Sequence, residues 1–198
     1  MKLVLFAPLL LIYSLQTACS HTVMDSYPEY LQKNENTLKL PKTKKSLSYT
    51  MNEKTSSHSE KIRSFKAGLA NSWVIEFGKV LQATMQSKDL KKAFTKIEEN
   101  GDSADVKWEV SLQKFTFKEH RAYIAIDVNA TTKDGKRLFM KTYQAQGNTQ
   151  GGKMFWGGAF AMRNAIHQST KAAMDKIFTS LVNDLQKALK KKGSYKSS

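Results

Sequence analysis

Two residues, Asp134–Gly135, constrain the fold of this chain more than any other feature, because they separate two stretches of alternating apolar and polar side chains. Both residue types tolerate the positive φ angles of a two-residue hairpin turn. The sequence therefore predicts an antiparallel pair of strands over 123–132 and 136–144 with one largely apolar face. Lys141 is the exception on that face and indicates a sheet edge or a bulge. The expected cross-strand pairs are Ile126 with Tyr143, Val128 with Lys141 and Ala130 with Phe139.

Hydrophobic periodicity predicts the other elements. Strands are expected over 46–51 and over 106–112, where apolar residues recur at every second position. A spacing near 3.6 predicts an amphipathic helix over 72–85, capped by Asn71, and a long helix over 160–189. A shorter helical or extended piece is expected over 90–97. The apolar stripe of the long helix consists of Met162, Ile166, Ser169, Ala173, Ile177, Leu181 and Leu185.

The small Ser169 and Ala173 in the middle of that stripe allow the long helix to lie close to a sheet. Together the elements predict a single α+β domain over 46–190. Its expected architecture is an antiparallel sheet of about four strands with two helices packed on one face.

The only cysteine, Cys19, follows a segment with the parts of a secretory signal. Lys2 supplies the basic start, residues 3–15 the apolar run, and Ala18 the small residue at the cleavage position. The run is shorter than the roughly 20 apolar residues of a membrane span. With a single thiol, no intrachain disulfide can support the fold.

Residues 1–19 resemble the start of a bacterial lipoprotein precursor, although Gln16 stands where that pattern usually has leucine. The resemblance implies a signal peptide over 1–18, removed before Cys19, and acylation of Cys19. Ser20 after the cysteine implies attachment to the outer membrane, facing the periplasm. The alternative is an ordinary signal peptide cut near Ala18, which would leave a free thiol in an oxidising compartment.

Two segments lack hydrophobic periodicity. Residues 19–45 contain Pro28, Pro41 and a lysine cluster, and are expected to form a flexible tether between the lipid and the domain. Residues 191–198 are expected to form a basic, polar tail.

The chain carries 32 basic and 17 acidic residues, a formal charge of +15, which indicates an anionic neighbour. An exported protein rarely meets nucleic acid, so we expect none as a partner. Anionic lipid headgroups or an acidic envelope protein fit the compartment better. The alternative is a basic surface that serves solubility alone.

Strands over 105–143, with the helix residues Ala165, Ser169–Thr170, Ala172–Ala173, Ile177, Leu181 and Asp184–Leu185, resemble the small periplasmic lipoproteins of the ABC-transporter auxiliary type. This resemblance implies a non-enzymatic protein that accompanies a transport or envelope-assembly complex. It transfers no functional residue other than Cys19.

Three possible catalytic patterns are weak. The glycine-rich 147–153 is like a phosphate-binding loop, but Met154 stands where that loop needs a hydroxyl for magnesium. Ser111 and Lys114 have the spacing of acyl-serine enzymes, but on a regular strand residues three apart point to opposite faces. The four histidines are scattered, and His120 is expected in a turn. We therefore expect no enzyme, cofactor or metal.

One glycine-bounded loop is unusual because it carries two large aromatic residues. Phe155 and Trp156 lie between Gly151–Gly152 and Gly157–Gly158. They either cap the core or serve as an exposed anchor for a partner or membrane interface.

The sequence thus predicts a lipid-anchored envelope binding protein, with Cys19 as the lipid site and Phe155 and Trp156 as partner-binding residues. The alternative is a periplasmic carrier of an apolar ligand, with a pocket between the sheet and the long helix. An enzyme of unrecognised type is the remaining class.

Overall fold

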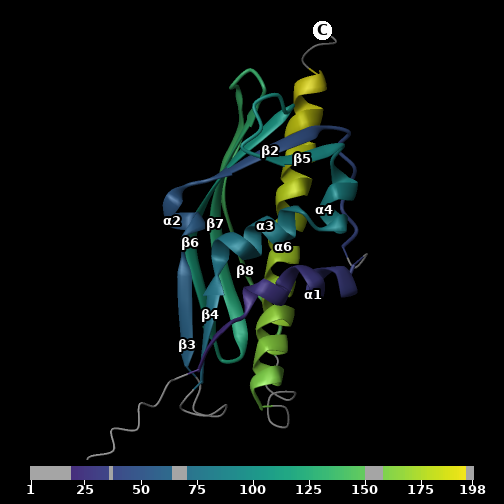
Figure 1. Ribbon diagram of the computed structural model, residues 1–198. Helices are drawn as coiled ribbons and strands as arrows, with labels where there is room; N and C mark the ends of the chain where they lie inside the picture. The colour runs from purple at the N-terminus through teal and green to yellow at the C-terminus, as the bar shows by residue number, and fades with distance from the viewer. Residues whose placement is uncertain (1–18, 36–37, 64–70, 150–157, 195–198) are drawn as a thin grey trace, which may run out of the picture.

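The computed structural model describes residues 19–35, 38–63, 71–149 and 158–194. Within these ranges the chain forms two sheets and several helices (Figure 1), so the predicted α+β class is confirmed. The finer prediction, one antiparallel sheet of about four strands with two helices, is wrong. The strands divide into a three-stranded and a five-stranded sheet, and both sheets mix parallel and antiparallel pairs.

The larger sheet has the order β5–β2–β6–β7–β8. Its strands are β2 (Ser46–Met51), β5 (Lys96–Glu99), β6 (Val106–Lys118), β7 (Arg121–Thr132) and β8 (Arg137–Gln146). The predicted strand over 46–51 is confirmed, and β6 continues six residues beyond the predicted end. β2 lies parallel to both of its neighbours, a pairing that the local sequence does not reveal.

The predicted hairpin register is confirmed, since all three expected residue pairs occur between β7 and β8. The turn itself differs. The amide of Gly135 donates to the carbonyl of Thr132, and the amide of Thr132 donates to the carbonyl of Lys136. Gly135 has a φ of 74°. This is a three-residue loop over 133–135 with a glycine bulge, and the register shift lies between Ala130 and Thr131.

The smaller sheet has the order β1–β4–β3, from β1 (Cys19–Thr22), β3 (Ser59–Arg63) and β4 (Asn71–Glu76). β4 replaces the first part of the helix predicted over 72–85, and only α3 (Phe77–Met85) is helical. Trp73 has a spacing that suits a helix, but here it belongs to a central strand that pairs with β1 and β3. Pairing with distant strands overrides the local periodicity.

The predicted tether over 19–45 is wrong for much of its length. After β1 come a 3₁₀ turn, η1 (Met24–Ser26), and α1 (Tyr27–Lys33). Val23, Met24, Tyr27 and Leu31 are buried in the main core. These apolar side chains anchor the segment, so the folded domain begins before residue 46. Met24, Tyr27 and Leu31 have the i, i+3, i+7 spacing of one helix face, a short signal that the expectation of a tether missed.

Short helices complete the N-terminal half: α2 (Glu53–Ser56), whose cap residue Asn52 accepts a hydrogen bond from the amide of Thr55, and α4 (Lys88–Ala93). The piece expected over 90–97 is therefore part helix, in α4, and part strand, in β5.

The long helix α6 (Gly158–Ser194) packs on β7 and β8, and every residue of its predicted stripe is buried. A Cβ on Gly147 would lie 2.0 Å from the carbonyl oxygen of Ser169, so the strand and helix approach as closely as glycine permits. The Ser169 hydroxyl accepts a hydrogen bond of 2.8 Å from the amide of Ala122. The helix also continues through Ser194, so the expected tail over 191–198 is helical at its start.

Figure 1 shows that α6 runs the length of the molecule. The start of α6 lies at the same end as the start of β4 and the end of β3, while the β7–β8 hairpin lies at the other end with the C-terminal turns of α6. Because Cys19 pairs with Asn71, β1 begins at the former end, which we call the Cys19 end.

Candidate functional site

Regular strand pairing fixes the position of Cys19 on the fold. β1 pairs in parallel with β4 from Cys19 to Thr22, and the His21 ring stacks on Trp73 at 6.2 Å. Val23 follows, and its amide donates to the carbonyl of Val74 at 3.0 Å. Cys19 is thus the first residue of a paired strand, so no flexible spacer separates it from the domain.

The next residues of the N-terminal segment contact α6 through a buried histidine. His167 Nε2 donates to the carbonyl oxygen of Val23 at 2.7 Å, and because a carbonyl can only accept, Nε2 carries the proton. The rings of Tyr27 and Tyr30 lie 5.5 and 5.2 Å from the imidazole. Burial lowers the pKa of His167, so the imidazole is neutral near pH 7.

The other candidate positions give no constellation for catalysis. Phe155 and Trp156, with most of the glycine-rich stretch, lie outside the described residues. His120 lies in the β6–β7 turn, as predicted, with a φ of 61°. Among the described residues, no three histidine, cysteine or acidic side chains are placed to hold a metal ion.

The prediction that Ser111 and Lys114 point to opposite faces is wrong, because a bulge between Leu112 and Lys114 interrupts β6. Ser111 is opposite Asp127 and Lys114 is opposite Ala125, so both lie on the outer face of the sheet. The Ser111 hydroxyl accepts a hydrogen bond of 3.1 Å from the side-chain amide of Asn52. Within the described part of the chain, no hydrogen bond joins Ser111 to Lys114, which an activated serine would require.

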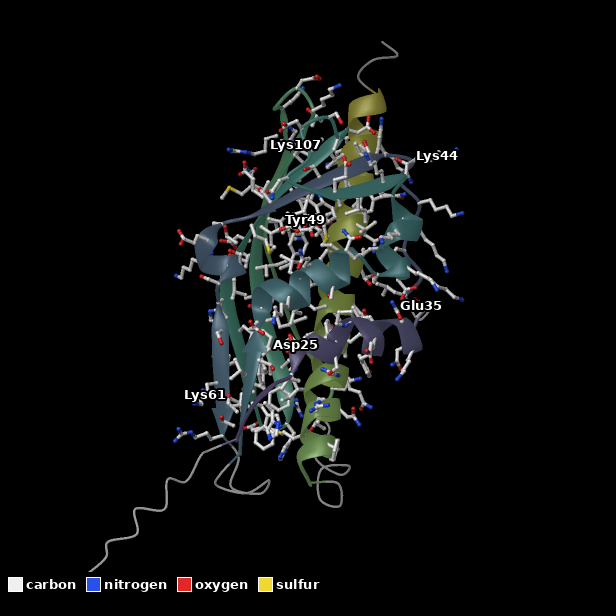
Figure 2. The ribbon with its side chains drawn as sticks, viewed as in Figure 1. Asp25, Glu35, Lys44, Tyr49, Lys61 and Lys107 are labelled. Atoms are coloured by element: carbon white, nitrogen blue, oxygen red, sulfur yellow. The ribbon has the colours of Figure 1, made fainter. Side chains whose placement is uncertain are left out.

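A cluster of basic residues lies at the end of the molecule opposite Cys19. The side-chain amide of Gln186 on α6 donates to the carbonyl of Lys42 at 2.8 Å, and the amide of Lys133 in the hairpin donates to that of Asp105. Lys44 and Lys107 lie toward this end in Figure 2. We call this end the basic pole and define it as residues 42–46, 105–107, 132–138 and 184–191. It holds ten lysines and arginines and three aspartates.

A groove at the basic pole separates the first residues of β8 from the last turns of α6. Its volume is about 480 Å³. We call it the cationic groove, and it is lined by Lys136, Arg137, Leu138, Phe139, Asp184, Lys187, Ala188 and Lys191. Leu138 and Phe139 are only partly buried, so the groove combines cations with accessible apolar surface.

The single carboxylate of the groove is already occupied. Lys141 Nζ and the Tyr143 hydroxyl donate to Asp184 Oδ2 at 2.7 and 3.1 Å. The hydrogen bond from Lys141 holds the pKa of Asp184 below its usual range. Lys141, the exception on the apolar face of the hairpin, thus serves to pair β8 with α6.

The cations of the groove have few protein partners. Lys187 Nζ is 3.9 Å from Asp184 Oδ1, and the Lys187 side chain is 76% exposed. Over the described ranges, no ion pair joins Lys136, Arg137 or Lys191 to a carboxylate. The charges of Lys136, Arg137 and Lys191, and that of the weakly paired Lys187, therefore face solvent. They surround the side chains of Leu138 and Phe139, which we call the apolar floor of the groove.

A second groove of about 570 Å³ lies between α1 and the helices α3 and α4. Two ion pairs cross it, Lys79 with Asp25 and Lys88 with Glu35, each at 2.7 Å. These pairs connect η1 to α3, and Glu35, which follows α1, to α4, and they engage two of the three lysines that line the groove. The second groove therefore does not account for the excess of basic residues.

No protein-family model matches the chain, and no curated protein is similar to it. Across the described residues, no helix combines the length and the apolar character needed to cross a membrane.

Sequence reasoning identified the basic residues at 42–45 and 190–192 as separate clusters, one in a tether and one in a tail. It missed the groove because the groove depends on two contacts between distant segments, β8 with α6 and Lys42 with Gln186. The only local signal was the pair Lys136–Arg137 beside Leu138–Phe139, directly after the hairpin turn.

Proposed function

We propose that this protein is a lipid-anchored binding module of the bacterial envelope, attached through Cys19 and presenting the cationic groove to an anionic partner. The observation that carries this proposal is the separation of the two sites. Cys19 opens β1 at one end of the molecule. The cationic groove is lined by residues at the start of β8 and in the last turns of α6, and Figure 1 shows the β7–β8 hairpin and the end of α6 at the other end. The outer membrane, with the domain facing the periplasm, is the proposed location.

The surface at the Cys19 end suits a membrane contact. Phe160, on the first turns of α6, is 77% exposed, and the Arg163 guanidinium lies 5.9 Å from its ring. Phenylalanine is typical of the apolar face of helices that lie at a membrane interface, and a nearby cation can interact with lipid phosphates. A lipid on Cys19 would hold this end against the bilayer.

A binding role is preferred to a catalytic one because several titratable side chains of α6 are already engaged within the protein. His167 is bound to Val23 and Asp184 to Lys141, and Lys171 pairs with Asp175 at 2.6 Å. His167 connects α6 to the N-terminal segment, and Asp184 connects α6 to β8. The pair of Lys171 and Asp175 joins successive turns of α6. We propose that this binding serves a transport or envelope-assembly complex.

The carrier alternative has little support. The space between the larger sheet and α6, where its pocket was expected, is filled by buried side chains. They include Ile126, Val128, Ala130, Ile166, Ala173, Ile177 and Leu181. A lipid enclosed there would have to displace the main core.

The test of the anchor is the substitution Cys19→Ala. If Cys19 carries the lipid, the variant should move from the detergent phase to the aqueous phase, since acyl chains contribute about 0.8 kcal/mol of membrane binding per buried methylene. Ser20→Ala, which changes the neighbouring exposed residue and keeps the thiol, is the matched control and should stay in the detergent phase. Detergent-phase partitioning of the Cys19→Ala variant would refute the lipid anchor.

A further inference from the structure

We infer that the cationic groove binds an anionic phospholipid, with the phosphate between the cations of β8 and α6 and the first part of an acyl chain against Leu138 and Phe139. This inference rests on the proposed binding function and names its ligand class.

The composition of the groove matches an amphiphile. Lys136 and Arg137 lie on the strand side, and Lys187 and Lys191, one helical turn apart, lie on the α6 side. Arginine and lysine on two facing walls can both donate to the oxygens of a single phosphate. A volume of about 480 Å³ is within the range of small-molecule sites, so the groove has room for a headgroup and the start of a chain.

The apolar floor favours a lipid over a purely polar anion. A nucleic acid or an acidic peptide would use the cations but would leave Leu138 and Phe139 against polar groups. A phospholipid satisfies both, because its phosphate is followed directly by glycerol and hydrocarbon. Contact with the chain would also remove the exposed apolar surface of these two side chains from water.

The distance of the groove from Cys19 decides which membrane can supply the lipid. Lys191 is 24 residues beyond His167, the residue that contacts Val23, and so about 36 Å further along the helix axis. β1 precedes Val23 and extends from it toward the Cys19 end, so Cys19 is further from Lys191 than Val23 is. Electrostatic attraction between exposed charges is largely screened beyond about 8 Å at physiological salt. A membrane that holds Cys19 therefore cannot attract the groove of an upright molecule, and the lipid belongs to a facing surface.

The test uses the Cys19→Ala chain, so that its outcome does not depend on acylation. Binding is measured by co-sedimentation with vesicles of phosphatidylcholine, with and without phosphatidylglycerol. Near an anionic surface each basic residue contributes a factor of about five to binding, so Lys136→Gln with Arg137→Gln should weaken it roughly 30-fold. The matched control is Lys54→Gln with Lys61→Gln, two exposed lysines on α2 and β3 that remove the same charge; Lys61 lies away from the basic pole (Figure 2). The control should change binding less than about threefold.

A second variant separates a lipid from a polar anion. Leu138 is partly buried at the bulge of β8, and Leu138→Ser should weaken binding to phosphatidylglycerol vesicles while leaving binding to inorganic polyphosphate unchanged. NMR spectra with a short-chain, monomeric phosphatidylglycerol should show shifts at the methyl groups of Leu138 and Ala188, which line the groove.

Several results would overturn the inference. Equal losses in the groove and control variants would show that overall charge, not the groove, determines binding. Polyphosphate or an acidic peptide bound as tightly as the lipid, with no effect of Leu138→Ser, would assign the groove to a polar anion. Failure of these tests leaves the Cys19 anchor standing, whereas failure of the partitioning experiment leaves the groove assignment standing.

Discussion

At the scale of single residues, His167 connects the N-terminal segment to α6. It is buried, and its Nε2 donates to the carbonyl of Val23. Charging the imidazole in this position would bury a cation that no carboxylate of the described residues contacts. Burial accordingly lowers the pKa of His167, and the nearby Arg163 contributes in the same direction. The contact is therefore made by the neutral form, and its stability depends on pH.

The first prediction concerns this pH dependence. An unfolded histidine has a pKa near 6.5, above that of the buried His167, so the unfolded state binds more protons as the pH falls. The stability due to the neutral form is complete above about pH 6.5 and is lost below it. The melting temperature should fall between pH 7.5 and 5.5, and His167→Gln, which stays neutral, should flatten that fall.

His120→Asn is the control, because His120 lies in a turn at positive φ, a conformation that asparagine tolerates. This control should keep the pH dependence of the parent. A His167→Gln variant with the same pH dependence as the parent would assign the effect to other groups. Burial raises the pKa of Asp175, so this carboxyl acts in the opposite direction as the pH falls.

At the scale of elements, the N-terminal segment is part of the domain and not a tether. Met24 is 1% exposed and belongs to the main core, while Gln32 on α1 is exposed. Met24→Ala should therefore cost about 2 to 5 kcal/mol of unfolding free energy, as buried large-to-small substitutions do. Gln32→Ala should change it by no more than about 0.5 kcal/mol. Thermal unfolding measures the stability of both variants. A Met24→Ala variant as stable as the parent would support the flexible tether instead.

The elements that could be predicted from sequence are those whose signal is local. The β7–β8 register follows from the alternation on both sides of Asp134–Gly135, and α6 follows from a stripe that keeps its spacing over seven positions. Residues 71–85 were misassigned because the apolar residues from Trp73 onward suit a helix as well as a strand that leads into one. The strand is stabilised by β1 and β3, and nothing within 71–76 specifies those partners.

The same reason explains why the candidate site was only partly predicted. Cys19 was identified by what precedes it in the sequence, and the structure adds that it begins a paired strand. The cations of the groove were visible in the sequence as separate clusters. Their convergence depends on an antiparallel hairpin that returns beside the end of a 37-residue helix, which is a property of the topology.

At the scale of the whole molecule, the fold is elongated and carries different side chains at its two ends. The Cys19 end carries the proposed lipid and the exposed Phe160, and the basic pole carries a net positive charge around an apolar groove. An anchor with no flexible spacer would hold the groove away from its own membrane. The protein is therefore suited to contact two surfaces at once.

The most direct test of this account is a vesicle-bridging measurement with the acylated protein. The protein, extracted from its own membrane, is reconstituted into neutral vesicles, and anionic phosphatidylglycerol vesicles are then added. We expect clustering, measured by light scattering, that weakens as salt rises and disappears when Lys136→Gln and Arg137→Gln are combined. Absence of clustering, from protein that is retained on the neutral vesicles and whose Cys19→Ala form binds anionic vesicles, would contradict the account, because it would mean that the groove cannot reach a facing membrane while the anchor is in place.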